Sequence, residues 1–182
     1  AYYLSNILDA LTSNPDVWSK TVLLVMYDEN DGLFDHVPPP VPPSGTAGEF
    51  VSGAPIGLGP RVPLLVLSPW SRGGYVCSQV FDHTSVLRFL ETWSGVQEPN
   101  ISAWRRQVCG DLTAALDFGS SNTSLPAFPD TAALLTQAQQ SKGWPAPTAP
   151  VPGQMPQPEA GRRPARALPY QCNAYASTDV AG

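Results

Sequence analysis

Charged residues are scarce in this chain, and long hydrophobic runs are missing. Only 14% of the 182 residues are charged, and the formal net charge is −5. Because the 10 lysines and arginines form no basic face, sequence-independent nucleic-acid binding is not expected. Uninterrupted apolar stretches are far shorter than the roughly 20 residues that a membrane-spanning helix needs. The hydrophobic content of 42% nevertheless suffices for one domain with a core.

Cysteines are also few. Cys77, Cys109 and Cys172 are an odd number without a C-x-x-C pair, which excludes a zinc-ribbon site. We interpret them as small buried hydrophobic residues, or as one disulfide between Cys77 and Cys109 if the protein is exported. The absence of a G-x-S-x-G motif argues against a serine hydrolase. The chain starts with Ala instead of Met and has no signal peptide, so we expect a piece of a longer polypeptide.

Two short runs of apolar and β-branched residues, at 21–27 and 62–70, predict strands buried on both faces. Such strands are typical of parallel sheets covered by helices. The segment 37–60 between them is rich in proline and glycine, which predicts a loop and no crossover helix. Apolar residues at helical spacing predict helices at 2–13 and 81–95. Shorter helices are expected at 103–108, after the cap residue Ser102, and at 111–117, after Gly110, and another at 131–142, opened by Asp130 and closed by Gly143.

These elements predict an α/β domain with a helix-covered, mostly parallel sheet. Two strands make a poor sheet, so we expect further strands from outside this chain. Residues 1–143 would form this incomplete domain. Residues 144–182 are so rich in proline that we expect an extended linker toward a following domain.

Local signals define the helix at 81–95 most clearly. Asp82 is a good N-cap, and Gly95 is a good C-terminal residue. Val86, Phe89, Leu90 and Trp93 form its apolar stripe.

An acidic cluster follows the first strand directly. Asp28, Glu29, Asp31, Asp35 and His36 lie within nine positions of one another. In parallel sheets, functional side chains gather just beyond the carboxyl ends of the strands, where Asp28 and Glu29 fall. Adjacent ionised carboxylates near strand ends repel each other unless a cation compensates. Ligands that are all oxygen favour a hard divalent ion such as Ca²⁺, Mg²⁺ or Mn²⁺.

Two other interpretations of this cluster stay open. Asp-Glu-Asn-Asp-Gly is also good turn chemistry, since Asp and Asn side chains hydrogen-bond to their own backbone. One carboxylate could instead act as a base without metal. The cluster is not a calcium loop of the EF-hand type, because Gly32 and Pro39 fall at the wrong positions.

Four consecutive segments carry a family resemblance. The stretches "VMYDENDGLFDHVPPP", "GLGPRVPLLVLSPWSRGGYV", "FDHTSVLRFLE" and "EPNISAWRRQVCGDLTAALDF" resemble the bacterial phosphoesterase family, which includes phospholipases C and acid phosphatases. The resemblance covers roughly residues 1–140, in the family's order. The stretch "GPRVPLLVLSP" is also similar to a strand-entry segment of arylsulfatases, which belong to the same alkaline-phosphatase-like superfamily.

The resemblance implies metal-assisted hydrolysis of phosphoric esters on an alkaline-phosphatase-like sheet. It places Asp28 and Glu29 as two ligands of one divalent metal ion. The remaining ligands and the Ser or Thr nucleophile would come from the N-terminal part of the parent chain. It also implies a secreted or periplasmic protein that acts on phosphate esters or phospholipids, such as phosphatidylcholine, with at most transient membrane-surface contact.

Other candidate residues have weaker signals. His36 could orient a ligand carboxylate. His83 lies at a helix N-terminus, which suits either a structural turn or a supporting place near phosphate. Arg61 is expected in a structural ion pair, and Arg105 and Arg106 on a solvated or inter-domain helix. The function alternatives are a broad-specificity acid phosphatase and a non-catalytic interaction domain.

Overall fold

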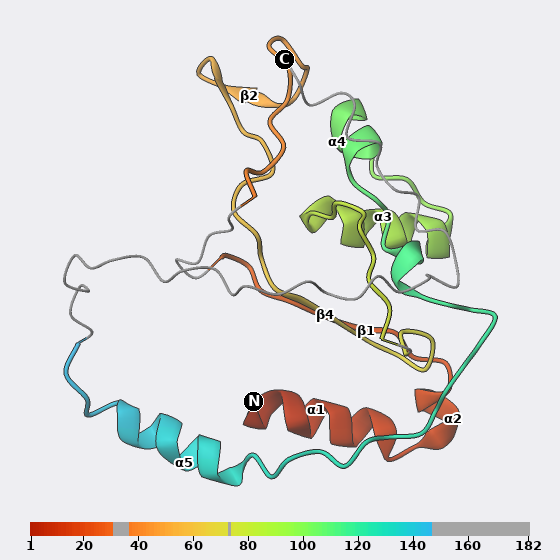
Figure 1. The fold of residues 1–182 in the computed structure, drawn as a ribbon, viewed down its shortest axis with the longest axis vertical. Coiled ribbons are helices and arrows are strands. Elements are labelled where there is room, and N and C mark those ends of the chain that lie inside the picture. Colours follow the sequence, from red (N-terminus) through yellow and green to blue (C-terminus); the bar gives the residue numbers. More distant parts are fainter. Residues whose placement is uncertain (31–36, 73, 147–182) are drawn as a thin grey trace, which may run out of the picture. The chain divides into compact units, whose positions relative to one another are not determined.

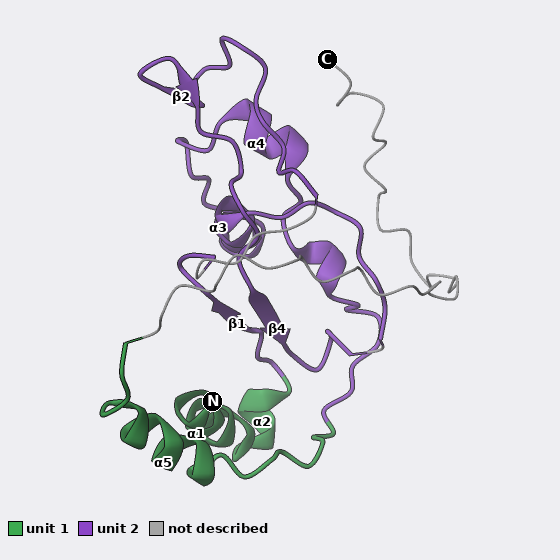
Figure 2. Cartoon of the chain, turned by 60° about the vertical axis from the view of Figure 1, so that its left-hand side comes forward, with its two compact units in different colours: residues 1–19, 124–167 green, residues 20–123, 168–182 purple. Residues whose placement is uncertain are grey.

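The computed structural model describes residues 1–30, 37–72 and 74–146. Of these, residues 1–19 and 124–146 form one compact unit, and residues 20–123 belong to the other (Figure 2). The predicted linker at 144–182 therefore lies almost entirely outside the described residues. None of the helices in the described part of the chain is long and apolar enough to cross a membrane.

The first unit consists of α1 (Tyr2–Thr12), α2 (Pro15–Trp18) and α5 (Ala132–Ser141). Leu8 and Trp18 are its buried apolar residues. The Asn14 side chain caps α2 by accepting a hydrogen bond from the backbone N–H of Asp16 at 3.1 Å. Pro15 follows at the first helical position, where a missing N–H costs nothing.

The second unit contains the sheet that the two apolar runs predict. Strands β1 (Leu23–Met26) and β4 (Leu64–Leu67) lie side by side (Figure 1). In their register, Met26 lies opposite Leu64. They pair antiparallel, so the predicted parallel arrangement is wrong for these two strands. An apolar run indicates burial but not strand direction. In the described residues of the connection, 27–30 and 37–63, no helix carries the chain back across the sheet, and this suits an antiparallel pair.

Burial of these strands on both faces is also not observed in the described residues. Leu65 is 46% exposed and Met26 is 36% exposed. The described chain is thus α/β in the coarse sense, with helices and a small sheet whose faces are only partly covered.

A short hairpin within the proline-rich loop was not predicted. Strands β2 (Phe50–Val51) and β3 (Ala54–Pro55) pair antiparallel around Ser52 and Gly53. Both turn residues have positive φ, at 51° and 80°, which is the conformation that two-residue hairpin loops favour. The dipeptide of Ser52 and Gly53 is the sequence signal from which this hairpin could have been predicted.

Helix α3 (His83–Ser94) confirms the prediction from its caps. The Asp82 side chain accepts a hydrogen bond from the Ser85 backbone, and the Ser85 side chain accepts one from the Asp82 backbone. Gly95 ends the helix at φ 75°. The predicted apolar stripe is not wholly packed among the described residues, because Leu90 is 45% exposed and Trp93 is 80% exposed.

Helix α4 (Ala103–Val108) follows its predicted N-cap, Ser102, whose hydroxyl accepts a hydrogen bond from the Arg105 backbone. The helix predicted at 111–117 is only a 3-10 turn, η1 (Thr113–Ala115). The core of the second unit gathers here, and its buried apolar residues are Ile101, Cys109, Leu112 and Leu116.

An ion pair ties α3 to α4. The Arg106 guanidinium donates to both carboxylate oxygens of Glu91, at 2.8 and 2.7 Å. These bonds, together with the hydrogen bond from the Glu98 backbone, lower the pKa of Glu91 from 4.5 to about 2. Because the folded-state pKa is depressed, this pair stabilises the fold above pH 4.5. That stabilisation is lost as the pH falls toward about 2.

We therefore expect the Glu91→Gln variant to lose less free energy of unfolding than the unsubstituted protein as the pH falls from 4.5 to about 2. The measurement is the urea concentration at which α3 and α4 are half unfolded, at a series of pH values. Asp9→Asn, an exposed change on α1, is the matched control and should keep the parent pH dependence. Equal pH slopes for Glu91→Gln and the parent would contradict this assignment.

Candidate active site

The acidic pair lies where the sequence places it, at the carboxyl end of β1. The backbone N–H of Tyr27 donates to the carbonyl of Pro63 at 3.1 Å, so pairing with the segment that leads into β4 continues through Tyr27. Asp28 and Glu29 come next, and both are exposed. The strand end thus presents two neighbouring carboxylates to the outside of the described fold.

The donor chemistry of this pair fits part of a site for a hard divalent ion. Such ions take six or more oxygen ligands. Across 1–30, 37–72 and 74–146, no cluster of three or more His, Cys, Asp or Glu residues is found. Asp31, Asp35 and His36 lie outside the described residues. Asp28 and Glu29 therefore supply two oxygen-bearing side chains, and a complete site needs additional ligands.

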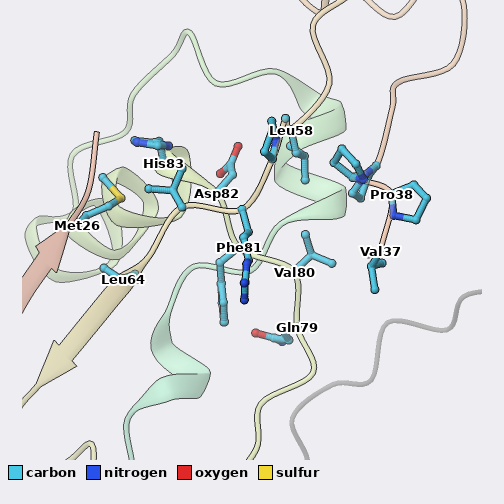
Figure 3. A pocket seen from close by; sticks show the side chains of 16 residues that line it. Met26, Val37, Pro38, Leu58, Leu64, Gln79, Val80, Phe81, Asp82 and His83 are labelled. Atoms are coloured by element: carbon cyan, nitrogen blue, oxygen red, sulfur yellow. The ribbon is translucent and has the colours of Figure 1, made fainter. Parts of the chain in front are cut away.

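A pocket of about 510 Å³ opens beside this strand end. Met26, the last residue of β1, and Leu64, the first residue of β4, form part of its wall (Figure 3). The rest of the lining comes from the proline-rich loop and from the approach to α3. The lining residues other than these two are Val37, Pro38, Pro39, Pro40, Leu58, Gly59, Pro60, Arg61, Val62, Gln79, Val80, Phe81, Asp82 and His83.

His83 lies at this pocket, but the adjacent helix end does not offer an anion site. The Asp82 carboxylate accepts hydrogen bonds from the Ser85 backbone at 3.1 Å and from the Thr84 hydroxyl at 2.6 Å. A carboxylate therefore already occupies the N-terminus of α3. This favours the structural interpretation of the turn at His83 over direct phosphate binding there.

Arg105 forms ion pairs that its sequence neighbours do not indicate. The sequence predicts a solvated or inter-domain helix here, but the Arg105 guanidinium instead binds two acids that lie far apart in the sequence. It donates to both oxygens of Glu49, at 2.8 and 3.0 Å, and to Asp82 at 2.6 Å. Glu49 is 1% exposed, so its charge depends on this partner. Burial lowers the pKa of Arg105, but the hydrogen bonds of Glu49 and Asp82 raise it above its ordinary value.

Two further bonds complete the cluster around this arginine. The Ser102 hydroxyl donates to Glu49 at 2.6 Å, and Arg105 also donates to the carbonyl of Gly57 at 2.9 Å. The Arg105 guanidinium thus joins three segments, which are the loop around the β2–β3 hairpin, the start of α3 and helix α4. Because Asp82 lines the pocket, this cluster also fixes part of the pocket wall.

Cys109 is a buried free thiol, so the considered disulfide with Cys77 is not formed. Burial and the neighbouring Asp82 raise the pKa of the Cys109 thiol to about 12. A thiol that stays protonated near neutral pH is a poor nucleophile. Cys109 is therefore a core residue and not a catalytic one.

The chain belongs to the phosphoesterase family, whose family model matches residues 1–97. This confirms the resemblance that the four sequence segments carry. Among curated relatives, the non-hemolytic phospholipase C of Pseudomonas aeruginosa is 53% identical, over 97% of this chain and 28% of the relative. The hemolytic phospholipase C of the same organism is 48% identical, over 99% of this chain and 27% of the relative.

A phospholipase C B of Mycobacterium tuberculosis is 49% identical, over 69% of this chain and 27% of the relative. The chain thus spans little more than a quarter of the length of these relatives.

Proposed function

We propose that this chain is the C-terminal part of the catalytic domain of a phospholipase C, a hydrolase of phosphoric diesters. The observation that carries the proposal is the identity of about half of the aligned residues to proteins named phospholipase C. The acidic strand end beside an apolar pocket agrees with such a role. The proposed fold of the whole domain is the alkaline-phosphatase-like sheet that the family resemblance implies.

In this proposal Asp28 and Glu29 hold one divalent ion, which is Ca²⁺, Mg²⁺ or Mn²⁺. When bound, such an ion supplies positive charge that stabilises the phosphoryl oxygens in the transition state. The two carboxylates fix its place at the end of β1. His36 is proposed to orient one of these carboxylates.

The proposed nucleophile is a Ser or Thr hydroxyl in the part of the catalytic domain that precedes this chain. Its oxygen bonds to phosphorus, and the glycerol oxygen leaves with a proton. Water then cleaves the phospho-enzyme, which releases the phosphorylated head group and restores the hydroxyl. Phosphatidylcholine is the proposed substrate. We further propose an exported protein that meets its substrate at a membrane surface.

The test compares the full-length protein with this chain alone on two chromogenic substrates. We expect the full-length protein to cleave the diester p-nitrophenylphosphorylcholine faster than the monoester p-nitrophenyl phosphate. This chain alone should release no p-nitrophenol above the buffer rate, because it lacks the nucleophile. Turnover by the isolated chain would contradict the divided site, and preference for the monoester would favour an acid phosphatase.

A further inference from the structure

We propose that the pocket beside β1 binds the acyl-glycerol portion of the phospholipid, which is the leaving group of the reaction. This inference rests on the proposed function and adds the site that receives the apolar part of the substrate. Its volume of about 510 Å³ falls within the roughly 300–1,000 Å³ typical of small-molecule sites.

The lining of the pocket is predominantly apolar. Figure 3 shows Val80, Leu58 and Leu64 on different segments around it, with Phe81 and Met26 nearby. The adjoining prolines 38–40 add apolar rings without N–H groups that would need hydrogen-bond partners. Burying hydrocarbon against such a wall is favourable because it removes apolar surface from water.

The aromatic and acidic residues of the described pocket lining are too few for a site that binds the cationic head group. A quaternary ammonium ion is typically bound by several aromatic rings. Phe81 is the only Phe, Tyr or Trp among the described lining residues. The one lining acid, Asp82, already forms an ion pair with Arg105 at 2.6 Å. The pocket therefore suits hydrocarbon better than choline.

The position of the pocket matches the connectivity of a phosphodiester. Met26 lines the pocket, and Asp28 follows two residues later. Two residues of extended chain span at most about 7 Å. The glycerol oxygen is bonded directly to phosphorus, so a phosphate at Asp28 and Glu29 leaves the glycerol and its acyl chains within reach of this pocket.

The first test uses the full-length protein without substitution. The value of kcat/KM is measured on monomeric phosphatidylcholines whose two acyl chains lengthen from four to eight carbons. We expect it to rise several-fold with each added methylene until the pocket is filled. A value independent of chain length would overturn the proposal.

The second test narrows the pocket. The measured quantity is kcat/KM for dihexanoyl-phosphatidylcholine divided by kcat/KM for p-nitrophenylphosphorylcholine. Val80→Trp should lower this ratio by about tenfold, because the leaving group of p-nitrophenylphosphorylcholine is only a single ring. Val76→Trp is the matched control, because Val76 is 57% exposed and outside the pocket lining, and it should keep the ratio.

The outcomes separate the two proposals. If another part of the full-length protein fills the pocket, Val80→Trp lowers both activities equally and the acyl-glycerol site is wrong. If the Val80→Trp variant does not fold, the dependence of kcat/KM on acyl-chain length in the unaltered protein decides whether the pocket binds the acyl-glycerol portion. If the unaltered protein cleaves neither substrate, the proposed function itself fails.

Discussion

Replacing Asp28 with Asn and Glu29 with Gln together should lower diester hydrolysis by the full-length protein at least about 100-fold. The substitutions keep the shape of both side chains but remove both negative charges. A metal ion held by such a pair stabilises transition-state charge by several kcal/mol, and each tenfold change in rate corresponds to about 1.4 kcal/mol. The loss should appear in kcat as well as in kcat/KM.

Metal content must fall with activity if the pair binds the ion. We expect calorimetry with Ca²⁺, Mg²⁺ and Mn²⁺ to show at least one ion that binds the parent protein and not the double variant. Asp9→Asn with Asp16→Asn is the matched control, since it also removes two exposed carboxylates of the same chain. That control should retain both activity and metal.

An unchanged metal content with unchanged turnover in the Asp28–Glu29 variant would refute the metal assignment and leave the turn interpretation. Reduced turnover with unchanged metal content would favour a carboxylate that acts as a base.

Elements with strong local signals could be predicted from the sequence. The apolar runs located β1 and β4, and Asp82, Gly95 and Ser102 located the ends of α3 and the start of α4. Each of these signals acts within a few residues, because a cap bonds to the first turn and a strand shows in its own composition. The placement of Asp28 and Glu29 at a strand end was available for the same reason.

Long-range features could not be predicted in this way. The direction of β4 relative to β1 depends on the path of the loop between them, which no local pattern records. Arg105 binds Glu49, 56 residues away, whereas its sequence neighbours Trp104 and Arg106 indicate only a solvated or inter-domain helix. The pocket likewise joins segments from 26 to 83 that are adjacent only in space.

Arg105→Met should strongly destabilise the second unit. It leaves the 1% exposed Glu49 and its neighbour Asp82 without their shared cation. Removing one partner of a buried ion pair costs about 3–5 kcal/mol, which is a large fraction of the about 5–15 kcal/mol that stabilises a typical domain. We expect amide hydrogen exchange in α3 and α4 of the full-length protein to accelerate accordingly.

Arg106→Met is the matched control on the same helix, because the Arg106–Glu91 pair is more exposed than the Arg105–Glu49 pair. Its effect on exchange should be clearly smaller, since solvent screens the charges left behind. Arg105→Lys should fall between the two, because one ammonium group cannot reproduce the forked contacts to Glu49 and Asp82. If Arg105→Met and Arg106→Met accelerated exchange equally, the arginine would not be the centre that joins the hairpin loop, α3 and α4. The fixed position of Asp82 in the pocket wall would then need another cause.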